Sequence, residues 1–81
     1  MGEVTNKTIL NISPHLGKYL VFVKASKAAQ NDTLTVTGLS SIDVAILICN
    51  NALESTSISG NVITLTSTNT GTIAGLVIGS K

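Results

Sequence analysis

Residues 33–37 read Thr-Leu-Thr-Val-Thr, a stretch in which polar and apolar side chains alternate at every position. Residues 61–66, Asn-Val-Ile-Thr-Leu-Thr, also alternate over most of their length. Because successive side chains of a β-strand point to opposite faces, a period of two is typical of a strand with one buried face. Thr, Val and Ile also fit the pleated surface of a sheet. We therefore predict an all-β fold.

Outside these two stretches, apolar segments separated by turn-forming Gly and Asn predict five further strands. The expected strands are residues 4–10, 18–25, 33–38, 42–49, 55–59, 61–67 and 72–79. Gly60 separates two of them by a single position, which indicates a tight hairpin. About seven short strands at this spacing indicate a small antiparallel sandwich or barrel. With 81 residues, the chain is expected to form a single β domain over residues 1–81.

Residues 13–29 permit two interpretations. Ser13 and Pro14 form a favourable helix start, and leucines follow at helical spacing. The run 19–23, Tyr-Leu-Val-Phe-Val, is instead rich in aromatic and β-branched residues, which favour strands. We expect a strand here, with a short helix as the alternative.

Two apolar runs stand out near the middle and the end of the chain. Residues 42–49 are apolar at nearly every position, which predicts a central strand covered on both faces. The strand at 72–79 has a similar composition. Its Gly75 and Gly79 are expected at bulges or at close approaches of two backbones.

The charge content excludes several function classes. Charged residues make up 11% of the chain, against about 25% in ordinary soluble domains. The five basic residues are all lysines and form no basic stripe, so we predict no nucleic-acid partner. The apolar runs are far shorter than the ~20 residues of a membrane-spanning helix, so we predict no membrane partner.

The residues that could carry chemistry do not form a recognisable set. His15 is the only histidine and lies in a predicted loop, with no nucleophile beside it. Cys49 has no adjacent His or Lys to activate it, so we interpret it as a small buried hydrophobe. Asp43 is expected to be exposed at the strand start or to cap a turn with Ser40 or Ser41. In the remaining alternative, Asp43 contacts a lysine from a neighbouring strand or chain.

A single cysteine and a single histidine also make no metal-ligand set. We therefore predict no catalytic, metal-binding or cofactor-binding residue, no cofactor and no enzymatic activity.

Three segments carry a resemblance to a known class of proteins. Residues 31–42 read NDTLTVTGLSSI, residues 58–66 read ISGNVITLT, and residues 74–79 read AGLVIG. Over residues 30–79 this texture resembles small all-β virion proteins of tailed phages and related viruses. The resemblance implies a capsid decoration or head protein that assembles as a homo-oligomer on a viral shell. Its partner would be the major capsid protein or another virion component, and it would be found in the virion after assembly in the host cytoplasm.

The residues favour an assembling protein independently of that resemblance. A chain of this length has a thin core, and open sheets expose edges that must be protected. Few charges and apolar strands therefore indicate a non-enzymatic structural protein whose surface is partly buried by another chain. The alternative is a small β-sheet module that binds carbohydrate or peptide, with Tyr19 and Phe22 as its only aromatic residues.

Overall fold

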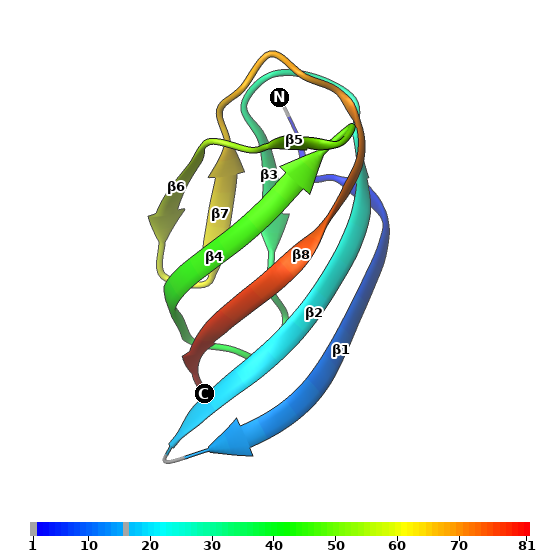
Figure 1. The fold of residues 1–81 in the computed structure, drawn as a ribbon. Helices are drawn as coiled ribbons and strands as arrows, with labels where there is room; N and C mark the ends of the chain where they lie inside the picture. Colours follow the sequence, from blue (N-terminus) through cyan, green and yellow to red (C-terminus); the bar gives the residue numbers. More distant parts are fainter. Residues whose placement is uncertain (1, 16) are drawn as a thin grey trace.

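The chain folds into two antiparallel sheets that face each other (Figure 1). The computed structural model describes residues 2–15 and 17–81, and at 11–15 it describes the backbone only. The described residues form strands and turns, without a helix. The strands are β1 (Thr5–His15), β2 (Lys18–Lys27), β3 (Asp32–Thr35), β4 (Ser41–Cys49), β5 (Ala52–Leu53), β6 (Thr56–Ser59), β7 (Val62–Leu65) and β8 (Gly71–Ser80).

The larger sheet has the order β1-β2-β8-β4-β5, and the smaller one has the order β3-β7-β6. Every pairing between named strands is antiparallel. The larger sheet lies at the front of Figure 1 and the smaller sheet behind it. The prediction of an all-β fold is confirmed, and the two facing sheets make it a small sandwich.

The hydrophobic core lies between the sheets and follows the period of two. On β2 the side chains of Val21, Val23 and Ala25 are buried, and on β7 those of Ile63 and Leu65 are buried. One continuous cluster joins both sheets. Its members are Val4, Val21, Val23, Ala25, Leu34, Val36, Leu39, Ile42, Leu47, Cys49, Ile63, Leu65, Ile73 and Val77.

Two hairpins have loops of two residues that include left-handed backbone positions. Gly60 has a φ of 61° at the first loop position between β6 and β7, where positive φ favours glycine. Asn50 and Asn51 both have positive φ, at 52° and 68°, between β4 and β5. Asparagine tolerates this conformation, so the Asn-Asn pair turns the chain back on itself. The hairpin expected around Gly60 is confirmed.

The structure corrects the predicted elements in three places. Ser13 and Pro14 lie in the backbone of β1, which runs on to His15, so the helical alternative for 13–29 and the loop placement of His15 are wrong. The short β5 was not predicted. The strand at 42–49 is covered on one face only, because within this chain the smaller sheet packs against a single side of it.

Gly75 and Gly79 lie where β8 passes very close to β4. A Cβ atom at Gly75 would collide with the Ile46 carbonyl oxygen and lie 2.8 Å from the Cα of Leu47. A Cβ atom at Gly79 would collide with the Ser41 carbonyl oxygen. The expected close approach of two backbones is therefore confirmed at both positions.

Candidate functional site

The sheet face that points away from the core, here called the outer face, carries a continuous apolar band. The strand register aligns Leu10 with Phe22, Phe22 with Leu76, and Leu76 with Ile46. These four side chains therefore form a row across four strands. Phe22 is half-buried, and Ile46 is 61% exposed.

Two further rows flank the first one. On one side, Leu20 and Val44 both pair with Ile78 of β8. On the other side, Ile48 pairs with Ala74 and with Leu53, which is 74% exposed. The three rows are thus apolar on β8 and β4, whereas on β2 the third row holds Lys24, which pairs with Ala74 and with Thr8 of β1.

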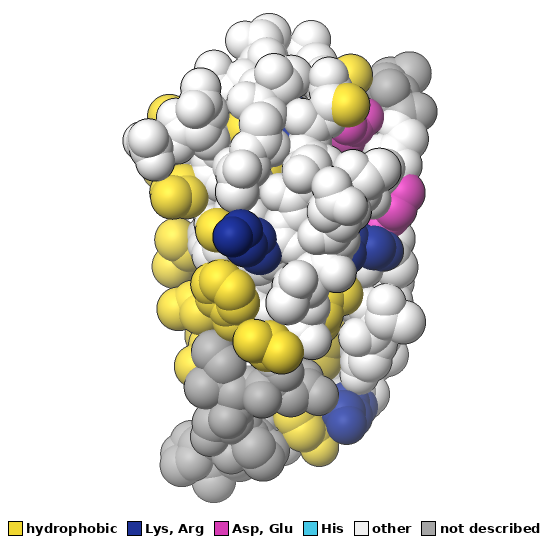
Figure 2. Space-filling view, turned by 90° about the vertical axis from the view of Figure 1, so that its right-hand side faces the viewer, with side chains coloured by type: hydrophobic (Ala, Val, Ile, Leu, Met, Phe, Trp, Pro, Cys, Tyr) yellow, Lys and Arg dark blue, Asp and Glu magenta, His cyan; other side chains and the backbone are white. Residues whose placement is uncertain are grey.

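The band combines several large aliphatic side chains that are exposed to water. Its seven large, exposed aliphatic side chains have exposed fractions between 37% and 74%. They are Leu10, Val44, Ile46, Ile48, Leu53, Leu76 and Ile78. Large contiguous apolar patches on monomeric proteins are often interaction sites. Figure 2 shows hydrophobic side chains gathered towards its left margin, which is the front of Figure 1.

One end of the outer face is charged. The Nζ atom of Lys18 on β2 lies 2.6 Å from Oδ2 of Asp43 on β4. The same ammonium donates a hydrogen bond to Oγ of Ser80, on the intervening strand β8, at 3.0 Å. Both charged side chains are about half exposed, at 50% and 47%. Asp43 is therefore exposed near the strand start, as expected, but its partner is a lysine two strands away, which was the alternative we did not favour.

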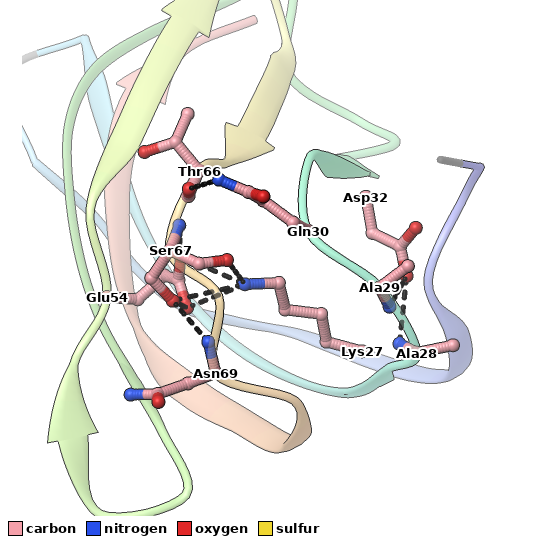
Figure 3. A network of polar contacts seen from close by, with 9 residues as sticks. All are labelled: Lys27, Ala28, Ala29, Gln30, Asp32, Glu54, Thr66, Ser67 and Asn69. Atoms are coloured by element: carbon pink, nitrogen blue, oxygen red, sulfur yellow. Dashed lines mark hydrogen bonds and ion pairs between the residues drawn. The ribbon is translucent and has the colours of Figure 1, made fainter.

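A buried polar network lies at the other end of the sandwich, inside the core (Figure 3). The Nζ atom of Lys27 contacts both carboxylate oxygens of Glu54 at 3.2 Å, and neither side chain is exposed. Lys27 also donates to the Ser67 carbonyl oxygen at 2.7 Å, and the Ser67 hydroxyl and N–H donate to Glu54. Each charge is thus satisfied from within the chain, so this network connects elements of the fold rather than binding a ligand.

Burial works against the charged form of Glu54, but the hydrogen bonds from Ser67 and the ammonium of Lys27 outweigh it. They hold the pKa of Glu54 below its usual value. This network was not predicted from the sequence. The signal was the alternation of β2, since Lys27 continues the buried positions Val21, Val23 and Ala25.

Cys49 lies beside this network and is buried, as expected. Burial raises the pKa of its thiol, and the negative charge of Glu54 raises it further. Because the thiolate is the reactive form, this cysteine is poorly suited to nucleophilic chemistry. His15 ends β1, and the surroundings of its side chain lie outside the described residues.

The two aromatic residues do not form an exposed binding platform. Tyr19 is half-buried and packs against the core cluster, and the Nζ atom of Lys81 lies 4.8 Å from the centre of its ring. Phe22 lies among aliphatic neighbours on the outer face. The aromatic stacking that sugar-binding surfaces use therefore has no counterpart at Tyr19.

Among the side chains that the structure describes, at residues 2–10 and 17–81, no group of three or more His, Cys, Asp or Glu could hold a metal ion. In the same part of the chain, no helix has the length and apolar character to cross a membrane. Comparisons of the chain with protein-family models, with curated proteins and with solved structures find no match.

Proposed function

We propose that this chain is a non-enzymatic structural protein of a virus particle, a capsid decoration or cement protein that acts as a homo-oligomer. Its partners would be copies of itself and the major capsid protein or another virion component. It would be found in the virion, after assembly in the host cytoplasm. The observation that carries this proposal is the uncovered apolar outer face of the five-stranded sheet.

Exposure of that apolar face to water costs free energy, which association recovers. Burying apolar surface contributes about 25 cal/mol per Å². The outer face exposes seven large aliphatic side chains, so covering it with protein is favourable. The low charge content of the chain points the same way, since charged residues are depleted at the centre of protein interfaces.

The polar groups support a structural role rather than a catalytic one. Among the described residues, each buried side-chain nitrogen and oxygen has a hydrogen-bond partner. The buried charges Lys27 and Glu54 neutralise each other inside the core. Placement on a viral shell comes from the resemblance of residues 30–79 to small virion proteins.

Two measurements test this proposal. Size-exclusion chromatography with light scattering should give a homo-oligomer, and a strictly monomeric species at high concentration would count against the assembly role. Mass spectrometry of purified virus particles from the source of the gene should detect this chain. Its absence from the particles would contradict the virion assignment even if the protein is oligomeric.

A further inference from the structure

We propose that a second copy of this chain covers the outer face, with the two-fold axis of the dimer running along β8. This inference rests on the proposed function, because both require self-association. It adds which surface is buried and how the two copies are oriented, and neither follows from oligomerisation alone.

The arrangement of apolar and polar residues on the outer face suits a pair of copies. A stable protein interface buries about 800 Å² on each partner and has an apolar centre with a polar rim. The apolar band supplies the centre. Lys18, Asp43 and Ser80 at one end, and Ser26 and Thr72 at the other, supply polar rims.

The sheet edges are less suitable for pairing than the face. β1 has two register irregularities and contains Pro14, which lacks an N–H donor. The edge of β3 is occupied by residues 2–4, since Val4 N–H donates to the Thr33 carbonyl oxygen at 2.9 Å. β5 has two residues and β6 has four. Irregular, covered and short edges are the usual protections against edge-to-edge pairing, so the face is left as the contact surface.

Two of the three rows of the outer face are balanced about β8, and the third places Lys24 on β2 opposite Ile48 on β4. Leu20 on β2 and Val44 on β4 lie on either side of Ile78, and Phe22 and Ile46 lie on either side of Leu76. A two-fold contact brings the same patch of both copies together, so the patch must complement itself. An axis along β8 lays the β2 side of one copy on the β4 side of the other, with apolar residues on both.

The charges agree with this axis. Lys18 and Asp43 lie on opposite sides of β8 at the level of Ser80. Rotation about β8 brings Lys18 of each copy over Asp43 of the other, so four charges of alternating sign meet. An axis across the strands would instead lay this charged end over the end near Ser26 and Thr72, where the nearest charge on the described outer face is another lysine, Lys24, and no carboxylate meets Lys18. Charge complementarity therefore selects the axis along β8.

Lys24 is the one lysine within the three rows, and it pairs in register with Ala74. It is exposed and contacts no carboxylate among the described side chains. Its long stem can lie along apolar surface while the ammonium reaches the polar rim near Ser26. Lys24 is therefore compatible with a covered outer face.

Charge reversal separates contacts between copies from contacts within one copy. Lys18→Asp places Asp over Asp43 of the second copy, and Asp43→Lys places Lys under Lys18. Each variant alone should raise the dissociation constant roughly tenfold or more at about 0.1 M salt. An equimolar mixture of the two variants should restore association, because every contact between copies again joins opposite charges. The Lys18–Asp43 pair within each copy stays broken in that mixture.

Sedimentation velocity over a concentration series measures each constant. Lys7→Glu breaks an exposed ion pair with Glu3, at 2.9 Å, that lies away from the outer face, so it serves as the matched control and should leave the constant unchanged. If the wild type associates but the mixture does no better than either variant, the orientation proposed here is wrong while the assembly role stands. A monomeric wild type would overturn both proposals.

Discussion

Gly75 has no room for a side chain. A Cβ atom there would overlap the backbone of Ile46 and Leu47, and backbone atoms of a paired strand cannot move aside as a flexible side chain can. We expect Gly75→Ala to lower the free energy of unfolding by about 1–3 kcal/mol, or more if β4 must shift. Urea denaturation measures the change. Gly2→Ala is the control, because a Cβ there meets no atom within 4 Å; equal effects of the two variants would contradict this account.

We expect the loss of the ion pair between Lys27 and Glu54 to lower the free energy of unfolding strongly, because both side chains are buried. Lys27→Gln leaves the Glu54 carboxylate in the core without a cation, which costs about 3–5 kcal/mol. Lys24→Gln makes the same chemical change at an exposed lysine and should alter stability by less than about 0.5 kcal/mol. Thermal or urea unfolding of the two variants compares them directly. Similar stabilities would mean that the pair is not shielded from water.

Acid should destabilise the fold through three carboxylates. Asp32 accepts hydrogen bonds from the N–H groups of Ala28, Gly2 and Ala29, which lower its pKa to about 2. The pKa values of Glu3 and Glu54 also lie below their usual values, despite some burial. A carboxyl whose pKa is lower in the folded chain than in the unfolded chain stabilises the fold fully above its unfolded pKa, and this stabilisation is lost as pH falls through the folded pKa.

The free energy of unfolding should therefore decline from about pH 5 down to about pH 2. Asp32→Asn keeps an oxygen that accepts a hydrogen bond but does not titrate, so its stability should depend less on pH in this window. Urea unfolding at a series of pH values gives both curves. Parallel curves for the wild type and the variant would show that Asp32 is not a source of the acid sensitivity.

At the scale of elements, the N-terminal segment protects an edge of the smaller sheet. Glu3 accepts hydrogen bonds from the N–H of Thr35 at 2.7 Å and from the hydroxyls of Thr33 and Thr35. Its backbone forms a parallel bridge with Thr33. The segment thus occupies the free side of β3, where an open edge would invite another strand.

Glu3→Ala removes the acceptor of the Thr35 amide without shortening the chain. We expect faster hydrogen exchange at Thr35, because its N–H loses its partner and faces water. The amide of Val36, which donates to the Asn61 carbonyl oxygen within the smaller sheet, should keep its protection and is the internal control. Unchanged exchange at Thr35 would contradict the capping role of Glu3.

Some of the strands could be predicted from the sequence and others could not. Alternation over residues 33–37 and 61–66 located two strands of the smaller sheet, because each has one buried face. β5 was not predicted, because a strand of two residues is too short to show an alternation of polar and apolar side chains. The turn before it could have been recognised from Asn50 and Asn51. The strand nature of residues 11–15 was missed because Ser13 and Pro14 also fit a helix start, and pairing with β2 decides between the two.

The candidate site was only partly predictable. The apolar run at residues 42–49 predicted a strand covered on both faces; the strand is present, but only one of its faces is covered. Which face the second sheet covers depends on the topology, which no local pattern contains. The contact of Lys18 with Asp43 joins strands that are neighbours only through β8, so their separation in the chain concealed it.

At the scale of the whole molecule, only one face of the larger sheet is covered by another layer of the protein. The smaller sheet covers the inner face of the larger one, and the aliphatic residues of the outer face remain in water. A thin two-layer protein with a third apolar surface gains stability when another layer covers it. Under the proposed function, the isolated chain is one half of a larger packed unit.

The most direct test is the oligomeric state of two matched variants, measured by light scattering over a concentration series. Ile46→Lys places a charge at the centre of the outer face, whereas Ile58→Lys places one at an exposed isoleucine of the smaller sheet. We predict that the wild type and Ile58→Lys are dimers or larger oligomers and that Ile46→Lys is monomeric and folded. An Ile46→Lys variant that associates as strongly as the wild type would contradict the central claim.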